Sequence, residues 1–223
     1  GLSSDNLKIL REALTRPYGL ILITGPTGSG KTTTLYAMLK ELDRDKKNVV
    51  SLEDPIEYNI SGVSQSQVRP EIGYTFANGL RTTLRQDPDI IMVGEIRDKE
   101  TAELAIQAAL TGHLVLSTLH TNNAAGVVPR LIDMGIDQYL IAATLAVAMA
   151  QRLVNVICPG SKKPMPVTAS IKIMAEKIFE DLPPEFKKRI PQIKQVYEAI
   201  PSSDCPGGTR GRTGVFELFV VDR

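Results

Sequence analysis

The sequence has few cysteines, few histidines and no excess of charge of one sign. Its 223 residues include two cysteines and two histidines, and the formal net charge at pH 7 is +1. A secreted domain that is held together by disulfides carries more cysteines in a shorter chain, so a reduced, cytoplasmic setting is expected instead. Because the charges are balanced and interleaved, no net field directs the chain toward nucleic acid or anionic lipid.

Long apolar runs are also missing. The longest one, at residues 139–150, is rich in alanine and too short to cross a bilayer. No signal-peptide pattern follows Gly1. The sequence starts without methionine and stops at Arg223, directly after an apolar run of strand character. We therefore expect a fragment of a longer protein that is truncated at its C-terminus.

Apolar runs of strand length alternate with segments of helical periodicity in the first half of the chain. Strands are expected at 20–24, 49–52, 90–93 and 114–118, and helices at 7–14, 33–42, 76–84, 101–110 and 123–134. This alternation predicts an α/β fold with a mostly parallel sheet and helices on both faces. Ligands of such sheets bind at the carboxyl ends of the strands. Pro129 is unexplained inside the last expected helix.

The composition changes after Val156. Proline, lysine and glutamate become frequent, and a helix is expected at 170–181, before Pro183-Pro184. Several glycines then precede an expected strand at 215–219. We therefore divide the chain into a core at residues 1–156 and a small appended subdomain at residues 157–223.

The most specific motif is a glycine-rich loop between an expected strand and an expected helix. Gly25-Pro26-Thr27-Gly28-Ser29-Gly30-Lys31-Thr32 matches G-x-x-x-x-G-K-[ST] at every position. Glycines allow successive N–H groups to turn inward, where they and the helix N-terminus favour the phosphates of a nucleotide. Lys31 would contact the β- and γ-phosphates of ATP, and the Thr32 hydroxyl would ligate Mg²⁺. Thr33 is included among the expected nucleotide contacts.

Carboxylates follow two of the expected strands. Glu53 follows the strand at 49–52, and Glu95 follows the strand at 90–93 after Gly94. Hydrolysis of ATP requires a bound Mg²⁺ and a polarised water, and a carboxylate near the phosphate loop can serve either need. The segment with Glu95 matches a Walker B pattern in which Glu replaces the usual Asp. A solvated loop acid is the alternative for either residue, and the phosphate loop upstream favours function.

Three segments, together with the phosphate loop, resemble the secretion ATPase family, which includes type II secretion ATPases and type IV pilus extension and retraction ATPases. Glu53-Asp54-Pro55-Ile56-Glu57-Tyr58 is similar to the Asp box of that family and Gly94-Glu95-Ile96-Arg97-Asp98 to its Walker B box. Residues 112–122 are similar to its His box. The resemblance extends from about Leu7 to Val156 and resumes at residues 211–214.

The resemblance implies a RecA-like P-loop NTPase core, assembled as a homo-hexamer with ATP and Mg²⁺ between subunits. It implies an ATP-hydrolysing motor for pilin or pseudopilin assembly, located in the cytoplasm at the inner membrane, with a membrane platform protein as partner. Glu95 would act on the catalytic water or on Mg²⁺, and Glu53 would support either one. His113 and His120 would sense the nucleotide near its γ-phosphate.

Three arginines also match family positions near the nucleotide: Arg81, Arg85 and Arg97. Arg81 and Arg85 can instead form a solvated helix face, since the other face of that segment is apolar. Each histidine, taken alone, can equally be a structural residue. These alternatives stay open at the level of sequence.

The two cysteines bear on a further family trait. Members that assemble pili usually carry two C-x-x-C pairs that bind zinc in the appended subdomain, whereas this sequence keeps only Cys158 and Cys205. A structural zinc site needs four ligands, so we expect no zinc in this degenerate metal-binding region.

Two other functions compete with the motor. One is a nucleotide-gated scaffold that binds ATP with little hydrolysis, for which two carboxylate segments would be unnecessary. The other is a DNA-export ATPase of related fold. The balanced charge and the lack of a basic stripe argue against nucleic acid as a partner.

Overall fold

The computed structural model describes residues 1–188, 190 and 192–221 and divides into two compact units. The first unit contains Gly1–Leu153 and Gly214–Arg223, and the second contains Val154–Thr213. The expected boundary after residue 156 is therefore moved, and the C-terminal segment does not belong to the appended subdomain. The physical reason is that β9 (Thr209–Val220) lies next to β6 (Leu145–Ile157) in the sheet of the first unit.

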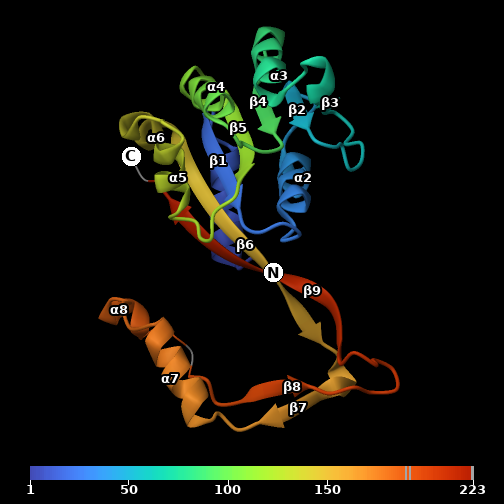
Figure 1. Cartoon of the computed structure of the whole chain (residues 1–223), viewed down its shortest axis with the longest axis vertical. Coiled ribbons are helices and arrows are strands. Elements are labelled where there is room, and N and C mark those ends of the chain that lie inside the picture. Colours follow the sequence, from blue (N-terminus) through green and yellow to red (C-terminus); the bar gives the residue numbers. More distant parts are fainter. Residues whose placement is uncertain (189, 191, 222–223) are drawn as a thin grey trace. The chain divides into compact units, whose positions relative to one another are not determined.

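The first unit is built on a sheet with the strand order β3-β2-β4-β5-β1-β6-β9 (Figure 1). The remaining strands are β1 (Gly19–Thr24), β2 (Val49–Glu53), β3 (Ser64–Gln67), β4 (Ile90–Val93) and β5 (Leu114–Leu119). The pairs from β3 through to β6 are parallel. Every position of β1, β2, β4 and β5 is buried, as continuous apolar runs covered on both faces require.

Helices cover both faces of this sheet. They are α1 (Ser4–Leu14), α2 (Lys31–Glu41), α3 (Phe76–Thr83), α4 (Lys99–Leu110), α5 (Val127–Asp133) and α6 (Gln138–Thr144). Apolar side chains of α1 and α2 share one core cluster with alternate residues of β1, including Ile21 and Ile23. Side chains of α3 to α6 share the opposite cluster with Leu20 and Leu22. The alternation follows from the two-residue period of a strand.

Each strand expected in the first half of the chain is present, and one expected helix is corrected. The helix expected at 123–134 begins only at Val127, so Pro129 is its third residue. A proline is tolerated in the first turn because its missing N–H has no intrahelical acceptor there. Short 3₁₀ helices occur at Pro70–Ile72, Leu84–Gln86 and Pro159–Ser161.

The second unit pairs β7 (Lys162–Met165) with β8 (Val196–Ala199) in antiparallel fashion and contains α7 (Ala169–Ile178) and α8 (Pro184–Lys187). Cys158 and Cys205 form a disulfide, which corrects the expectation of reduced cysteines. Next to the disulfide, the N–H of Cys158 donates to the carbonyl of Gly208 over 3.1 Å, so the start and the end of the unit lie together.

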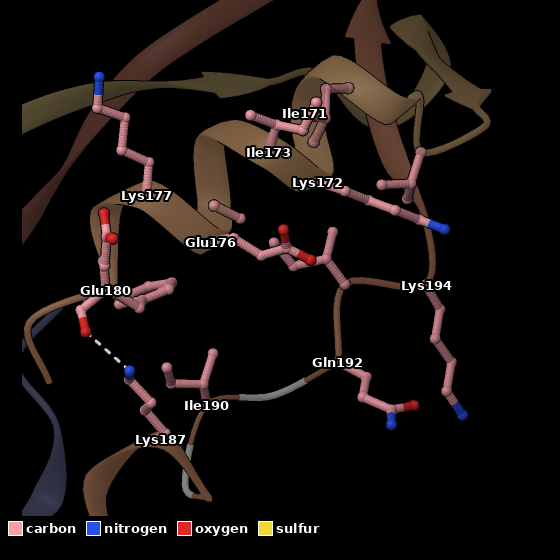
Figure 2. Close-up of a pocket in the computed structure, with 14 residues that line it drawn as sticks. Ile171, Lys172, Ile173, Glu176, Lys177, Glu180, Lys187, Ile190, Gln192 and Lys194 are labelled. Atoms are coloured by element: carbon pink, nitrogen blue, oxygen red, sulfur yellow. Dashed lines mark hydrogen bonds between the residues drawn. The ribbon is translucent and has the colours of Figure 1, made fainter. Parts of the chain in front are cut away.

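A groove of about 940 Å³ lies between α7 and the segment that follows α8. Ile171, Glu176 and Ile190 are among its lining residues, and Lys187 Nζ donates to the carbonyl of Glu180 over 2.7 Å (Figure 2). Across both units, the described helices are all too short or too polar to span a membrane.

Candidate functional site

The phosphate loop connects the carboxyl end of β1 to α2. Three of its glycines have positive φ values, namely +139° at Gly25, +74° at Gly28 and +89° at Gly30. Residues with a Cβ rarely adopt these conformations, so glycine is required for this path of the chain. The loop therefore forms for the reason that the motif predicts.

The N-terminus of α2 is suited to an anion. Its first turn contains no acidic residue, and Gly30 at the N-cap provides no side chain that would satisfy the first N–H groups. Thr32 and Thr33 are exposed. In the described part of the chain, the buried Oγ of Ser29 has no hydrogen-bond partner. Unsatisfied donors around a glycine cradle fit the phosphates of a nucleotide.

Lys31 folds back over the loop. Its Nζ donates to the carbonyl of Gly25 over 3.0 Å and to that of Pro26 over 3.1 Å. Burial lowers the pKa of Lys31, while the negative charge of Glu95 acts in the opposite direction. The ammonium group of Lys31 is thus hydrogen-bonded within the loop and interacts electrostatically with the carboxylate of Glu95.

Glu95 lies beyond the end of β4, between an arginine and a histidine. Its side chain is 13% exposed, and its two carboxylate oxygens lie 2.6 Å from Arg97 Nη2 and 3.5 Å from His120 Nε2. The hydrogen bond to Glu95 is the largest cause of the raised pKa of Arg97. The structure therefore brings together Glu95, Arg97 and His120 and places Lys31 within electrostatic range.

Glycine at position 94 allows this carboxylate to sit at the strand end. A Cβ on Gly94 would lie 3.2 Å from the carbonyl oxygen of Leu52 on β2. On its other side, the Thr118 hydroxyl of β5 donates to the Gly94 carbonyl over 2.7 Å. Both neighbouring strands thus contact the backbone that leads to Glu95, and a Cβ at position 94 would be in unusually tight contact with β2.

The segment carrying His120 is tied to the start of the phosphate loop. The Thr24 hydroxyl donates to the carbonyl of Leu119 over 3.0 Å, and the N–H of Thr121 donates to that hydroxyl over 2.7 Å. Thr24 is fully buried and is the last residue of β1. One hydroxyl at the carboxyl end of β1 therefore fixes both sides of His120.

Glu53 is held in a buried network of hydrogen bonds. It is 2% exposed and accepts hydrogen bonds from Ser51 Oγ over 2.6 Å, from Gln65 Nε2 over 2.9 Å and from the hydroxyl of Tyr36. Burial and this bond raise the pKa of Tyr36 to about 12. With both oxygens hydrogen-bonded, Glu53 joins β2 and β3 to α2, and it lies at the end of the strand that pairs with β4, the strand that precedes Glu95.

His113 contradicts the expectation that both histidines lie near the γ-phosphate. It precedes β5, whereas His120 follows it, so the whole strand separates them. The N–H of Leu114, the residue after His113, donates to the carbonyl of Asp89 over 3.1 Å, and Asp89 precedes β4 at the amino end of the sheet. The Nδ1 of His113 lies 3.0 Å from the carbonyl of Ala108. This histidine is placed at the edge opposite the phosphate loop.

Arg81 and Arg85 are not brought to the phosphate loop within this chain. Arg81 forms an ion pair with Glu100 and donates to Asn78 Oδ1 over 3.1 Å. Arg85 is exposed in the 3₁₀ turn after α3. Both side chains are exposed, Arg81 on α3 and Arg85 in the turn that follows it.

The sequence reasoning missed Gln151, a buried polar residue of β6 that touches the phosphate loop. The only signal available was a polar residue directly after an alanine-rich apolar run. As for metals, the described ranges contain no group of three His, Cys, Asp or Glu side chains placed to hold an ion.

Comparison with known proteins finds relatives that are named as secretion and pilus ATPases. The type II secretion system ATPase E of Vibrio cholerae is 51% identical over 223 residues, which are 100% of this chain and 42% of that protein. The type IV pilus assembly ATPase PilB of Myxococcus xanthus is 48% identical over 226 residues, covering 98% of this chain and 38% of that protein. The chain thus spans about two fifths of the length of these relatives.

Solved structures support the same fold. The Legionella pneumophila ATPase DotB superposes with a TM-score of 0.63 at 29% identity, over 99% of this chain and 49% of that one. The pilus retraction motor PilT with bound ADP gives 0.62 at 37% identity, over 82% and 56%. The predicted RecA-like P-loop fold is confirmed by these neighbours. A model of the type II/IV secretion system protein family matches residues 1–223, and the chain belongs to this family.

Proposed function

We propose that this chain is the nucleotide-binding part of an ATPase motor that powers type II secretion or type IV pilus assembly. The observation that carries the proposal is the meeting of Glu95, Arg97 and His120 at the edge where the phosphate loop begins. The names of the relatives, a type II secretion ATPase and a pilus assembly ATPase, support both the activity and its purpose.

The residues of the loop have distinct tasks in this proposal. The backbone N–H groups of residues 25–33 and the ammonium of Lys31 bind the phosphates of ATP, with Lys31 exchanging its carbonyl acceptors for phosphate oxygens. Thr32 and Glu95 are the candidate ligands of Mg²⁺, which when bound neutralises phosphate charge. The exposure of the Thr32 hydroxyl is compatible with this role.

Glu95 is proposed to act either on the catalytic water, as the base that orients it and accepts its proton, or on Mg²⁺ as its ligand. Arg97 and His120 hold the carboxylate from two sides, so its orientation is defined before substrate binds. His120 is half-exposed and remains the proposed sensor of the nucleotide state. Arg81 and Arg85, both exposed, are candidates for nucleotide contacts only where another subunit faces them.

The proposed assembly follows the family. We propose a homo-hexamer in the full-length protein, located in the cytoplasm at the inner membrane and working on pilins or pseudopilins through a platform protein. Nucleic acid is not a proposed partner, because the net charge is only +1.

Binding of ATP tests the foundation of the proposal. Lys31→Ala removes the cation of the phosphate loop, and ATP affinity measured by calorimetry should fall at least about tenfold. Lys172→Ala, a matched loss of one positive charge on exposed α7, should leave affinity unchanged. If Lys31→Ala and the unmodified protein bound ATP with equal affinity, the assignment of residues 25–32 as the ATP-binding loop would be wrong.

A further inference from the structure

Gln151 is a buried amide beside the phosphate loop. It is 4% exposed and directly follows Ala150, which pairs with Thr24 at the end of β1. The strand before it is apolar, from Leu145 to Ala150. A buried primary amide is costly unless its polar atoms are paired, so its hydrogen-bond partners indicate why it is there.

Both ends of the Gln151 amide bind the nucleotide-binding segment. The Nε2 donates to the carbonyl of Ser29 within the loop over 2.7 Å. The Oε1 accepts from the hydroxyl of Thr34, in the first turn of α2, also over 2.7 Å. One side chain of β6 therefore bridges the loop and the helix that follows it.

The loop is packed directly onto this residue. A Cβ on Gly30 would lie 2.9 Å from the Nε2 of Gln151, and a Cβ on Gly25 would lie 2.3 Å from its backbone oxygen. Two of the motif glycines thus leave room for Gln151 in addition to allowing positive φ. The contact is part of how the loop is built.

The bond to Ser29 has a consequence for the next peptide N–H. A trans peptide is planar, so its carbonyl and its N–H point in opposite directions. When Gln151 holds the carbonyl of Ser29, the N–H of Gly30 is turned away from Gln151. In the proposed function, that is the side on which the phosphates are bound.

We propose that Gln151 is a positioning residue for ATP, which sets the orientation of the Ser29–Gly30 peptide and the first turn of α2. The inference rests on the proposed function, since it concerns the same phosphates. The two bonds need one donor and one acceptor in a single side chain, which glutamine supplies and glutamate does not.

The test compares variants that lose one of the two hydrogen bonds of Gln151 with a variant that loses both. Gln151→Glu keeps the acceptor for Thr34 but replaces the donor to Ser29 by an oxygen that repels the carbonyl. Thr34→Val removes only the other bond, and Gln151→Met removes both. Gln107→Glu, on an exposed position of α4, is the matched control for the added charge.

Association and dissociation of a fluorescent ADP analogue with Mg²⁺ are measured by stopped flow, at a temperature at which circular dichroism shows every variant to be folded. We expect Gln151→Glu to weaken binding of the analogue about tenfold, mainly through slower association. The reason is that the phosphate loop has the binding-competent conformation in a smaller fraction of the molecules. Thr34→Val should weaken it about threefold, and adding Thr34→Val to Gln151→Met should have no further effect.

Wild-type association and affinity in folded Gln151→Glu would overturn the positioning role while leaving the proposed function intact. Failure of the folded, unmodified chain to bind the analogue would overturn the proposed function, and this inference with it. A loss of affinity in Gln107→Glu equal to that in Gln151→Glu would also overturn the inference, because a general charge effect would then explain both.

Discussion

The core unit buries its apolar side chains on both faces of a sheet, whereas the second unit leaves many of its own on the surface. Leu20 and Leu22 of β1 are fully buried. On α7, by contrast, no residue is buried, and Ile173, Met174 and Ile178 are 62–63% exposed. A disulfide links the start and the end of the second unit. This difference indicates that hydrophobic burial stabilises the core and that the second unit depends more on its cross-link.

The difference extends to chemistry. In the core, charged side chains meet at a strand end that sits next to a glycine-lined loop. In the second unit, charged residues such as Lys172 and Glu176 line a groove formed by an exposed helix (Figure 2). Similar residue types thus occur in both units, but those of the core follow fully buried strands, which can keep a reactive geometry fixed.

The largest expected difference between the two units is in ATP hydrolysis. Glu95→Gln removes the carboxylate charge without changing its size, and phosphate release by the full-length protein should fall about a hundredfold or more while ATP still binds. Glu176→Gln, the same change on α7, should leave turnover unchanged. Unaltered turnover in Glu95→Gln would show that Glu95 is not the base and would leave ATP hydrolysis to another residue.

The next difference between the units concerns how much a buried or an exposed apolar side chain contributes to stability. Leu22→Ala leaves a cavity in the core, and the free energy of unfolding should fall by about 2–5 kcal/mol. Ile173→Ala on α7 removes a largely exposed side chain, so a change within about 0.5 kcal/mol is expected. Urea denaturation of both variants checks this. A large loss for Ile173→Ala would mean that α7 is covered in the folded protein, and the comparison would no longer hold.

The smallest effect concerns the cross-link. Cys158→Ser removes the disulfide that cross-links the second unit. The free energy of local unfolding of that unit should then fall by about 2–4 kcal/mol. Limited proteolysis should then cut faster within residues 154–213, while the melting of the core stays unchanged. Addition of a reductant to the unmodified protein should reproduce the result, and Ser203→Ala, at an exposed site nearby, serves as control. Identical cleavage with and without the disulfide would contradict it.

Several strands escaped prediction because their sequences have no clear period. β3 consists of Ser64-Gln65-Ser66-Gln67, a polar segment that forms a strand only by pairing with β2. β6 follows the short helix α6 without a break in apolar character, so its start at Leu145 had no local signal. Such segments are decided by the neighbours with which they pair, and periodicity does not contain that information.

The sequence by itself determined the phosphate loop, the four buried strands β1, β2, β4 and β5 with the helices between them, and the family. Glycines with positive φ and continuous apolar strands act locally, so their effects are visible in a short window.

Only the tertiary structure decided which polar residues meet. It separated His113 from His120 by the length of β5 and placed Glu53 in a network with Tyr36. It also brought Gln151 of β6 onto the carbonyl of Ser29. The physical reason is that the carboxyl ends of parallel strands converge at one edge whatever their separation in sequence, so these contacts depend on strand order and register.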